Sequence, residues 1–473
     1  MRVHPTPMPL HQLLTEAGIP VPAGLPAATV SGIAVDSRAV RPGDLFIAIC
    51  GLHTDARRFI AQAAAQGAVA VICEDTESTV ADDQGLPVVT VANARVAMAC
   101  LYDAWYGHPG RRLRLVGVTG TNGKTTTKEL IREVLSVKYR VAATEGNLNN
   151  SIGVPLTLLK MAPDTQIAVV EMGASHPGDI KELVDIALPN YGLITNVGKA
   201  HLLGFGSFEG VKATKGELYD YLRRTADKAF INVDNPHLCQ MASERNMQHD
   251  SERPYSLLLP YGLDYQGGVV LFSDEKHPFL RILCGGVIIN TNLVGSYNAD
   301  NVMAAIAVGV HFGVSFEDAV KAIEAYVPAN KRSQMTKTER NTLIVDAYNA
   351  NPTSMAAALE NFSNVSADCK VAMLGDMLEL GEESLAEHVA VIKSACSRGL
   401  AHVYFVGKEF QAASGALASE LGTEAAAQLL SNAYFFSTSD ELAAHLASEH
   451  LSGATILIKG SRGTRMENVI PVL

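Results

Sequence analysis

The sequence predicts an α/β protein of about three domains: a small N-terminal α/β unit, a central parallel sheet with an antiparallel appendage, and a second doubly wound α/β unit. The first observation behind this is the length, 473 residues. The second is that short apolar runs rich in branched residues, typical of strands buried on both faces, alternate with helix-compatible segments. The third is that proline and glycine residues near 108–110 and 328 mark boundaries between domains. The expected domains are 1–110, 111–328 and 329–473.

Bulk composition excludes several classes of protein. Hydrophobic residues make up 48% and charged residues 18%, which is ordinary globular composition. The net charge of −11 argues against nucleic acid as a partner. The 7 cysteines are scattered and never in CxxC spacing, so we expect reduced thiols and no zinc site. Neither a signal peptide nor an apolar run of membrane-spanning length is evident, so we expect a soluble, cytoplasmic protein.

The N-terminal domain is expected to be a small parallel α/β unit. Ser37 and Arg38 lie in a loop after its first strand; the arginine either binds a phosphate or is solvated, and the spacing alone favours solvation. Strands are expected at Ile33–Val35, Leu45–Ala48, Val69–Cys73 and Val88–Val91, with a helix at Phe59–Gln66.

The central domain begins with a strand, Leu113–Val118, a glycine-rich turn and a helix, Thr126–Val137. This is the context of a phosphate-binding loop, in which backbone N–H groups and the helix N-terminus face an anion. Lys124 is expected to reach the β/γ-phosphates and the Thr125 hydroxyl to bind Mg²⁺. The alternative is a turn that binds nothing, because Val118 stands where the GxxxxGK[ST] pattern has its first glycine. The expected nucleotide-binding residues are Gly120, Thr121, Asn122, Gly123, Lys124, Thr125 and Thr126.

Polar residues follow the next elements of this domain. Asn147, Asn149 and Asn150 share a loop and serve either as ligand contacts or in turn chemistry. A short helix is expected at Pro155–Leu159. The strand Ile167–Val170 ends at Glu171, which is a metal-ligand candidate if it lies near the phosphate loop, and otherwise a cap or ion-pair member.

Two further candidates follow the strand Gly192–Val197. His201 is a metal ligand or a structural residue. Lys215, on a helix expected at Val211–Leu222, is solvated, balances charge near phosphate and metals, or is modified, and the spacing does not decide.

The end of the domain adds a strand, Ala229–Val233, and an antiparallel appendage at Gly267–Val294. Asn298 and Asn301 lie at the start of a helix, Ala299–Phe312, where they cap it or contact a base edge. A last helix is expected at Phe316–Ala325.

The third domain is expected to be Rossmann-like, with ligand-facing residues at its strand ends. These are Asp346, Asp376 and the loop Lys459–Arg462, where a glycine lets a ligand approach. The expected elements are strands at Leu343–Val345, Val371–Leu374, Val403–Val406 and Thr455–Ile458, and a helix at Thr353–Phe362.

Together these residues resemble the Mur ligases, whose superfamily also contains folylpolyglutamate synthetases. The shared residues are TGTNGKTTT, Glu171, His201 and KATKGEL around Lys215. Three stretches are similar to the branch of the family that adds D-alanyl-D-alanine to UDP-MurNAc-tripeptide. The C-terminal segment KGSRGTRME is also similar to that branch. Relatives in other branches usually have histidine at the position of Asn349. The three stretches are NLNNSIGVPLTLL from Asn147, YNANP from Tyr348 and LGDMLELG from Leu374.

The resemblance implies an ATP- and Mg²⁺-dependent ligase that works through an acyl phosphate, with the tripeptide and the dipeptide as substrates. The central domain is expected to be P-loop ATPase-like. We also expect a monomer that binds neither nucleic acid nor membrane, although the sequence does not give the oligomeric state. The sequence leaves open whether the third residue of the tripeptide is lysine or diaminopimelate.

The resemblance also assigns residues. Catalytic roles fall to Lys124, His201 and Lys215, and metal binding to Thr125, Glu171, His201 and a carbamylated Lys215. Asn298 and Asn301 would contact adenine, although Tyr297 stands where relatives often have histidine. Arg332 and Asp346 would reach ATP from the third domain, with Ala347 replacing a second aspartate common in relatives. Substrate contacts would come from Ser37, Arg38, Asn147, Asn149, Asn150, Asn349, Asn351, Ser461 and Arg462.

Two alternatives compete with this reading of the sequence. One is a sister ligase that adds diaminopimelate, lysine or glutamate, against which the Asn349–Asn351 stretch argues. The other is a nucleotide-dependent switch without catalysis, against which the intact Lys124, Glu171 and Lys215 argue.

Overall fold

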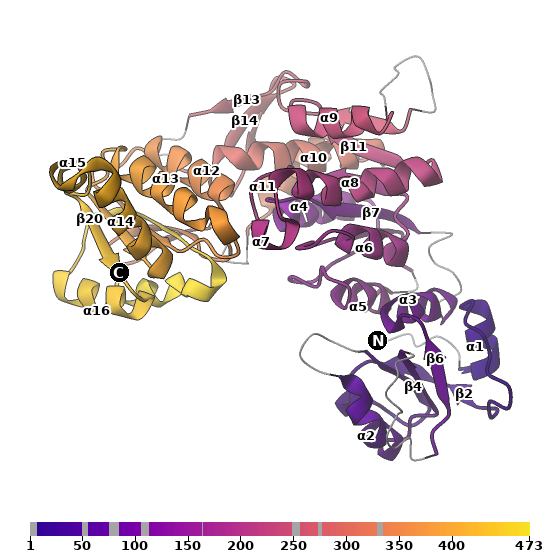
Figure 1. Ribbon diagram of the computed structural model, residues 1–473. Helices are drawn as coiled ribbons and strands as arrows, with labels where there is room; N and C mark the ends of the chain where they lie inside the picture. The colour runs from indigo at the N-terminus through magenta and orange to yellow at the C-terminus, as the bar shows by residue number, and fades with distance from the viewer. Residues whose placement is uncertain are drawn as a thin grey trace. The chain divides into compact units, whose positions relative to one another are not determined.

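The structure is a computed structural model that describes residues 7–49, 55–74, 85–105, 113–162, 164–247, 256–272, 277–328 and 334–473. It confirms a mixed α/β fold with parallel sheets (Figure 1). Its residue contacts define two compact units: Met1–Gly117, Tyr139–Met172 and Lys181–Tyr191 form one, and Val118–Lys138, Gly173–Ile180 and Gly192–Leu473 form the other.

The N-terminal sheet has four parallel strands in the order β3-β4-β5-β6. One apolar layer contains residues of α1 (Leu10–Glu16) and α3 (Ala94–Trp105), and the other contains residues of α2 (Ile60–Ala65). The sequence predicted all four strands to within one residue at each end but neither α1 nor α3. The strands are β3 (Gly32–Ala34), β4 (Asp44–Ala48), β5 (Ala70–Glu74) and β6 (Val88–Val91), and β1 (Met8–Pro9) pairs separately with β2 (Thr29–Val30).

A six-stranded sheet in the order β12-β11-β10-β7-β9-β8 carries the glycine-rich turn. The apolar runs of the sequence form its buried strands, as predicted. Its strands are β7 (Arg114–Thr119), β8 (Val141–Ala143), β9 (Ile167–Glu171), β10 (Tyr191–Ile194), β11 (Lys228–Asn232) and β12 (Leu258–Tyr261).

The predicted strand Gly192–Val197 was too long, because β10 ends at Ile194. Beyond that point the Thr195 N–H still donates to the Thr119 carbonyl of β7 at 2.9 Å, while the Thr195 and Asn196 side chains bond to the glycine-rich turn. The polar side chains just after this strand therefore hold the neighbouring loop.

Helices of this part of the chain follow the expected order. The helices predicted at Val211–Leu222 and Ala299–Phe312 are α8 (Phe208–Thr225) and α10 (Ala299–His311), and that at Phe316–Ala325 is α11 (Phe316–Ala325). The remaining helices are α4 (Lys124–Ser136), α5 (Gly153–Leu159), α6 (Asp179–Ala187), α7 (Leu202–Phe205) and α9 (Pro236–Glu244).

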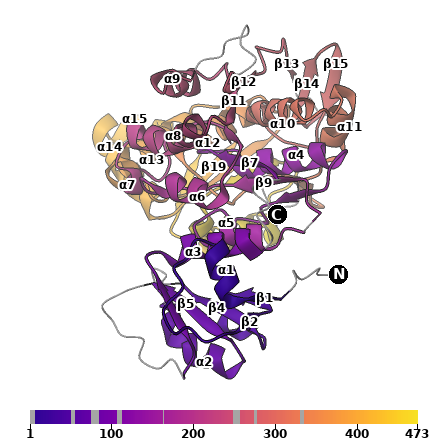
Figure 2. The same ribbon diagram turned by 90° about the vertical axis from the view of Figure 1, so that its right-hand side faces the viewer.

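The predicted antiparallel appendage is confirmed as a three-stranded sheet. It consists of β13 (Val269–Leu271), β14 (Arg281–Cys284) and β15 (Val287–Asn290), which lie beside α11 (Figure 2). The Asn290 N–H donates to Glu324 Oε1 of α11 at 2.9 Å, so a side chain of the helix holds the edge of the appendage.

The C-terminal sheet has six strands in the order β16-β17-β21-β18-β19-β20, all parallel except the edge pair β16–β17. Helices cover both faces, so each central strand contains a run of buried apolar residues. The sequence predicted β17 (Thr342–Asp346), β18 (Lys370–Gly375), β19 (His402–Val406) and β21 (Thr455–Lys459), but missed the edge strands β16 (Gln334–Lys337) and β20 (Ala433–Phe436). The helices are α12 (Pro352–Ser363), α13 (Ser384–Cys396), α14 (Lys408–Leu421), α15 (Thr423–Leu429) and α16 (Ser439–Glu449).

Within the described ranges no helix has both the length and the apolar character that crossing a bilayer requires.

Candidate active site

The glycine-rich turn joins β7 to α4 as the sequence predicted, although the helix starts two residues earlier, at Lys124. Gly120 has φ +141° and Gly123 has φ +80°, conformations that L side chains rarely adopt. A Cβ at Gly120 would lie 2.0 Å from Thr195 Oγ1, and one at Gly123 would lie 2.5 Å from Asn301 Oδ1. The loop therefore depends on glycine for both its backbone and its close contacts.

The loop after β10 holds this turn in place. The Thr121 N–H donates to the Asn196 carbonyl at 2.9 Å, and the Asn122 N–H donates to Asn196 Oδ1 at 3.0 Å. The Thr195 hydroxyl donates to the Asn122 carbonyl at 2.6 Å. Sequence reasoning gave Thr195 and Asn196 no role in the turn, because their partners lie more than 70 positions away.

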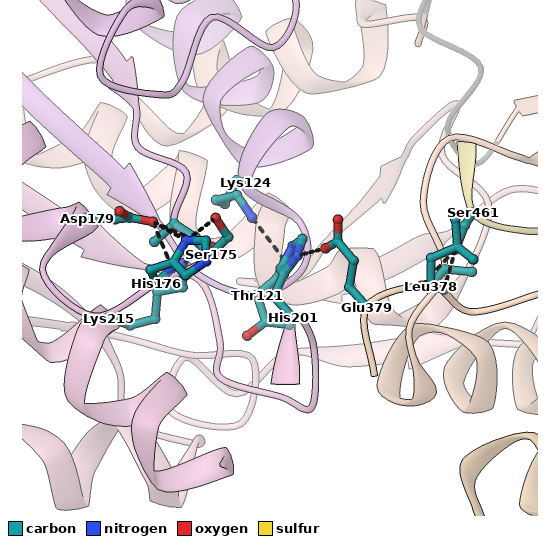
Figure 3. Close-up of polar contacts among 12 residues, drawn as sticks. Thr121, Lys124, Ser175, His176, Asp179, His201, Lys215, Leu378, Glu379 and Ser461 are labelled. Carbon is teal, nitrogen blue, oxygen red and sulfur yellow. Dashed lines mark hydrogen bonds and ion pairs between the residues drawn. The ribbon is translucent and has the colours of Figure 1, made fainter. Parts of the chain in front are cut away.

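The start of α4 is suited to an anion. The N-cap residue of α4 is Gly123, which has no side chain to cap the helix, and the positive end of the helix dipole at this point favours an anion. The Lys124 ammonium donates to the carbonyls of Gly120 at 2.7 Å and of Thr121 at 3.0 Å, which keeps it over the turn (Figure 3). Thr125 is buried in the first turn of the helix.

Asn298 and Asn301 form a buried chain of amides that ends at α4. Asn298 Nδ2 donates to the Val294 carbonyl, and Asn301 Nδ2 donates to Asn298 Oδ1, both at 2.8 Å. The Thr127 hydroxyl then donates to Asn301 Oδ1 at 2.9 Å. Both amides thus help to hold the start of α4.

Glu171, at the end of β9, has an unusual environment. Its side chain is 1% exposed, and Oε1 accepts from Asn149 Nδ2 at 2.8 Å. Oε2 is buried and has no hydrogen-bond partner among the described residues. An orphaned buried carboxylate oxygen is costly unless a cation neutralises it, so this residue fits a metal ion.

The other asparagines of this loop differ from Asn149. Asn150 Oδ1 accepts from the N–H groups of Ile152 at 3.2 Å and Gly153 at 2.8 Å, so it performs the turn chemistry that the sequence left open. Asn147 is exposed.

Lys215 and His201 lie close enough to Lys124 for its charge to affect both (Figure 3). Lys215 is 2% exposed, and burial lowers the pKa of its amine well below the usual value, with the Lys124 charge adding to the effect. Burial also lowers the pKa of the His201 imidazole; the Glu379 carboxylate opposes this, and Lys124 and Lys215 reinforce it. The His201 Nδ1 atom pairs with Glu379 Oε2.

Three loops at the strand ends of the C-terminal sheet meet at Ser461. The Leu378 N–H donates to Ser461 Oγ at 3.1 Å, and that hydroxyl donates to the Ala350 carbonyl at 3.4 Å. The Ser461 N–H donates to the Asp376 carbonyl at 3.2 Å. The exposed Arg462 guanidinium lies 6.0 Å from the Tyr348 ring centroid.

The candidates after β17 are held by buried contacts. Lys459 Nζ bonds to Asp346 Oδ2 at 2.6 Å and to the Asn349 carbonyl at 3.1 Å. Asn351 forms a capping box with Ser354 at the start of α12. Its Nδ2 also donates to Asn122 Oδ1 at 2.8 Å, so this residue contacts the glycine-rich turn directly. The Asn349 side chain is exposed.

In the N-terminal sheet, the buried Ser37 hydroxyl donates to Gln62 Oε1 at 2.9 Å. The exposed Arg38 pairs with Asp36 at 2.7 Å, and this hydrogen bond lowers the pKa of Asp36 to about 2. Arg332 and the expected linker at 108–110 lie outside the described residues.

In the ranges that the structure describes, no three His, Cys, Asp or Glu side chains form a ready-made metal cluster. A metal ion bound by Glu171 would therefore need other oxygen ligands, such as phosphate oxygens.

The fold and the turn define a class: multi-domain α/β proteins with a glycine-rich turn between a buried strand and a helix. Three family models match in succession, "Mur ligase family, catalytic domain" at residues 29–106, "Mur ligase middle domain" at 118–309 and "Mur ligase, glutamate ligase domain" at 331–462. The chain belongs to the Mur ligase family.

Within the family, curated relatives identify the branch. The chain is 36% identical to the UDP-N-acetylmuramoyl-tripeptide–D-alanyl-D-alanine ligase of Bacillus subtilis (strain 168), over 75% of each protein. It is 34% identical to the ligase of that name from Escherichia coli (strain K12), over 94% of each.

Solved structures agree. The crystal structure of MurF from Acinetobacter baumannii has a TM-score of 0.81 and 28% identity, over 99% of each chain. That of the MurF ligase from Thermotoga maritima in complex with ADP has a TM-score of 0.75 and 27% identity, over 93% of this chain and 96% of that one. Within the Mur ligase family, the chain is thus similar to the MurF ligases.

Proposed function

We propose that this chain is the ATP-dependent ligase that joins D-alanyl-D-alanine to UDP-N-acetylmuramoyl-tripeptide in peptidoglycan precursor synthesis. The observation that carries the proposal is the turn before α4, where Lys124 lies over two loop carbonyls and Asn351 of the branch-specific YNANP stretch contacts Asn122. This contact joins the phosphate loop to the part of the chain that distinguishes the branch.

The chemistry requires activation because a carboxylate is a poor electrophile. A carboxylate oxygen of the tripeptide attacks the γ-phosphorus of ATP, the bond to the β,γ-bridging oxygen breaks, and ADP leaves. The dipeptide amine then attacks the carbonyl carbon of the acyl phosphate. The tetrahedral intermediate expels phosphate, the amine loses a proton, and the amide remains.

The cationic residues suit this reaction because it brings two anions together. Two like charges ~4 Å apart repel by roughly 4 kcal/mol at an effective dielectric of 20. Lys124, held over the turn, offsets this repulsion and stabilises charge on the transferred phosphoryl group.

Mg²⁺ fits the residues present, and the unpartnered Oε2 of Glu171 supports this. Thr125, Glu171 and His201 are the proposed ligands, together with Lys215 if it is carbamylated. The metal supplies Lewis-acid neutralisation of phosphate charge. The lowered pKa of Lys215 supports the modification, because a neutral amine is the form that adds CO₂.

The other predicted roles stay proposals. Asn298 and Asn301 are proposed beside the adenine, Asp346 and Arg332 on ATP, and the domain boundaries after residues 110 and 328. The proposed substrate contacts are Ser37, Arg38, Asn147, Asn149, Asn150, Asn349, Asn351, Ser461 and Arg462.

Release of phosphate from Mg-ATP tests the function. We expect it to require both UDP-MurNAc-tripeptide and D-Ala-D-Ala, and the product mass to equal their sum less water. Release that instead requires diaminopimelate, lysine or glutamate as the amine would identify a sister ligase. Hydrolysis indifferent to every substrate would favour a nucleotide switch and contradict the proposal.

A further inference from the structure

We propose that Glu379, in the loop after β18, is a positioning residue for His201. The Glu379 carboxylate accepts a hydrogen bond from Nδ1–H and so keeps the proton on that nitrogen. The lone pair of Nε2 is then available to a metal ion. The inference rests on the proposed function only in naming that ion; the pairing itself is a property of the chain.

The two residues meet through side chains and backbone together. His201 Nδ1 pairs with Glu379 Oε2, and the Leu203 N–H donates to the Glu379 carbonyl at 3.2 Å (Figure 3). His201 has φ +51° and Glu379 has φ +65°, so both non-glycine residues adopt the left-handed conformation. Such backbone strain persists only where surrounding contacts impose it, and it concentrates at functional sites.

Two hydrogen bonds hold the backbone of the residues just before Glu379. The Met377 N–H donates to Nε2 of the fully buried His388 at 3.0 Å, and His388 Nδ1 bonds to the Ser384 carbonyl at 2.7 Å. The next N–H, of Leu378, bonds to Ser461 at 3.1 Å. The backbone before Glu379 is therefore held in place, while the Glu379 side chain itself is 58% exposed.

Apolar packing fixes the histidine side of the contact. Leu202 and Phe205 of α7 belong to the same buried cluster as Met377 and Leu380, which flank Glu379. The N–H groups of Gly204 and Phe205 both donate to the His201 carbonyl at 3.0 Å. His201 is thus held by the C-terminal sheet's loop although it belongs to the α7 segment of the central part of the chain.

The consequence lies in imidazole chemistry. The ring nitrogen that carries the proton is set by the hydrogen bond at the other nitrogen. Histidines that bind metals usually donate their second N–H to a carboxylate or carbonyl, which fixes the ring and raises its basicity. Among the described residues His201 Nε2 makes no hydrogen bond, so the pairing leaves it as the acceptor.

A purely structural ion pair is the alternative, and the chain provides a matched control. Lys199, two residues before His201, pairs with Glu387 at 2.6 Å and with Glu383 at 3.0 Å, also across this contact. Lys199→Ala removes the ion pairs with Glu383 and Glu387 but keeps the bond between Glu379 and His201. Glu379→Ala removes the bond itself, and Glu379→Gln keeps an acceptor oxygen in place.

The tautomer of His201 is the direct test. We would record ¹⁵N correlation spectra of ¹⁵N-histidine-labelled full-length protein, without metal, at a pH where the imidazole is neutral, and assign His201 with His201→Gln. The Nδ1–H form is expected in wild type and Lys199→Ala, and is expected to be lost in Glu379→Ala. An Nε2–H form in wild type, or the same tautomer in Glu379→Ala, would overturn the inference.

Metal affinity is the second readout. Loss of the free Mn²⁺ signal in electron paramagnetic resonance, at fixed ADP, is expected to show affinity about 10–100-fold weaker in Glu379→Ala. Glu379→Gln should recover part of this loss, and Lys199→Ala should match wild type. Equal losses of Mn²⁺ affinity in Lys199→Ala and Glu379→Ala would show that Glu379 only holds the loop after β18 against the α7 segment, and would overturn the inference. Failure of the proposed function would instead appear in wild type, as phosphate release that ignores the substrates.

Discussion

Replacing Lys124 by alanine lowers kcat for amide formation by about 10³-fold. The ammonium lies at the turn that precedes α4, held by two loop carbonyls, where it meets the charge of the transferred phosphoryl group. Its removal takes away a preorganised cation that interacts most strongly in the transition state, so kcat falls more than KM rises. Steady-state kinetics of phosphate release measure both constants.

The fold should survive this change. The substitution removes two bonds to loop carbonyls, each worth about 1 kcal/mol net, and the turn keeps its contacts to Thr195 and Asn196. Lys138→Ala is the matched control, because that exposed lysine bonds to the Gly313 carbonyl and lies just beyond the opposite end of α4 from the turn. Activity of Lys124→Ala within a few-fold of this control would contradict the assignment.

Replacing Lys459 by alanine destabilises the protein by about 3–5 kcal/mol. The Lys459 side chain is 1% exposed and its ion-pair partner Asp346 is 18% exposed, so the change leaves a largely buried carboxylate without its cation. It also removes the bond to the Asn349 carbonyl, which helps to hold the YNANP stretch. Urea denaturation of the full chain, followed by far-ultraviolet circular dichroism, measures the loss.

A second variant separates the buried charge from packing. Lys459→Met keeps most of the side-chain volume, and combining it with Asp346→Asn removes both charges. We expect the double variant to be less destabilised than the sum of the single ones, since neither charge is left unpaired. Loss below about 1 kcal/mol in Lys459→Ala would mean that the pair contributes no more than a surface ion pair.

Strong local patterns made much of the fold predictable. The apolar run at 113–118, the glycines after it and the following helix all point to one structure, and β7, the turn and α4 confirm it. Parallel strands of the C-terminal sheet were equally clear because they are buried on both faces. The edge strands β16 and β20 carry mixed sequence and partial burial, so the same criterion does not detect them.

The site was less predictable because its contacts join distant parts of the chain. A single sequence does not distinguish Asn150 from Asn149, yet Asn150 accepts from the N–H groups of Ile152 and Gly153, whereas Asn149 bonds to Glu171. Glu379 lies 178 positions from His201 and resembles any solvated loop carboxylate, apart from its place in LGDMLELG. Long-range pairing of this kind follows from topology, which local sequence does not encode.

The path of one oxygen atom tests the central claim most directly. UDP-MurNAc-tripeptide labelled with ¹⁸O in the reacting carboxylate would be turned over with Mg-ATP and D-Ala-D-Ala, and the released phosphate analysed by mass spectrometry. If an acyl phosphate forms at the turn that contains Lys124, each released phosphate carries one labelled oxygen from the carboxylate. Phosphate without label, accompanied by amide product, would contradict the account.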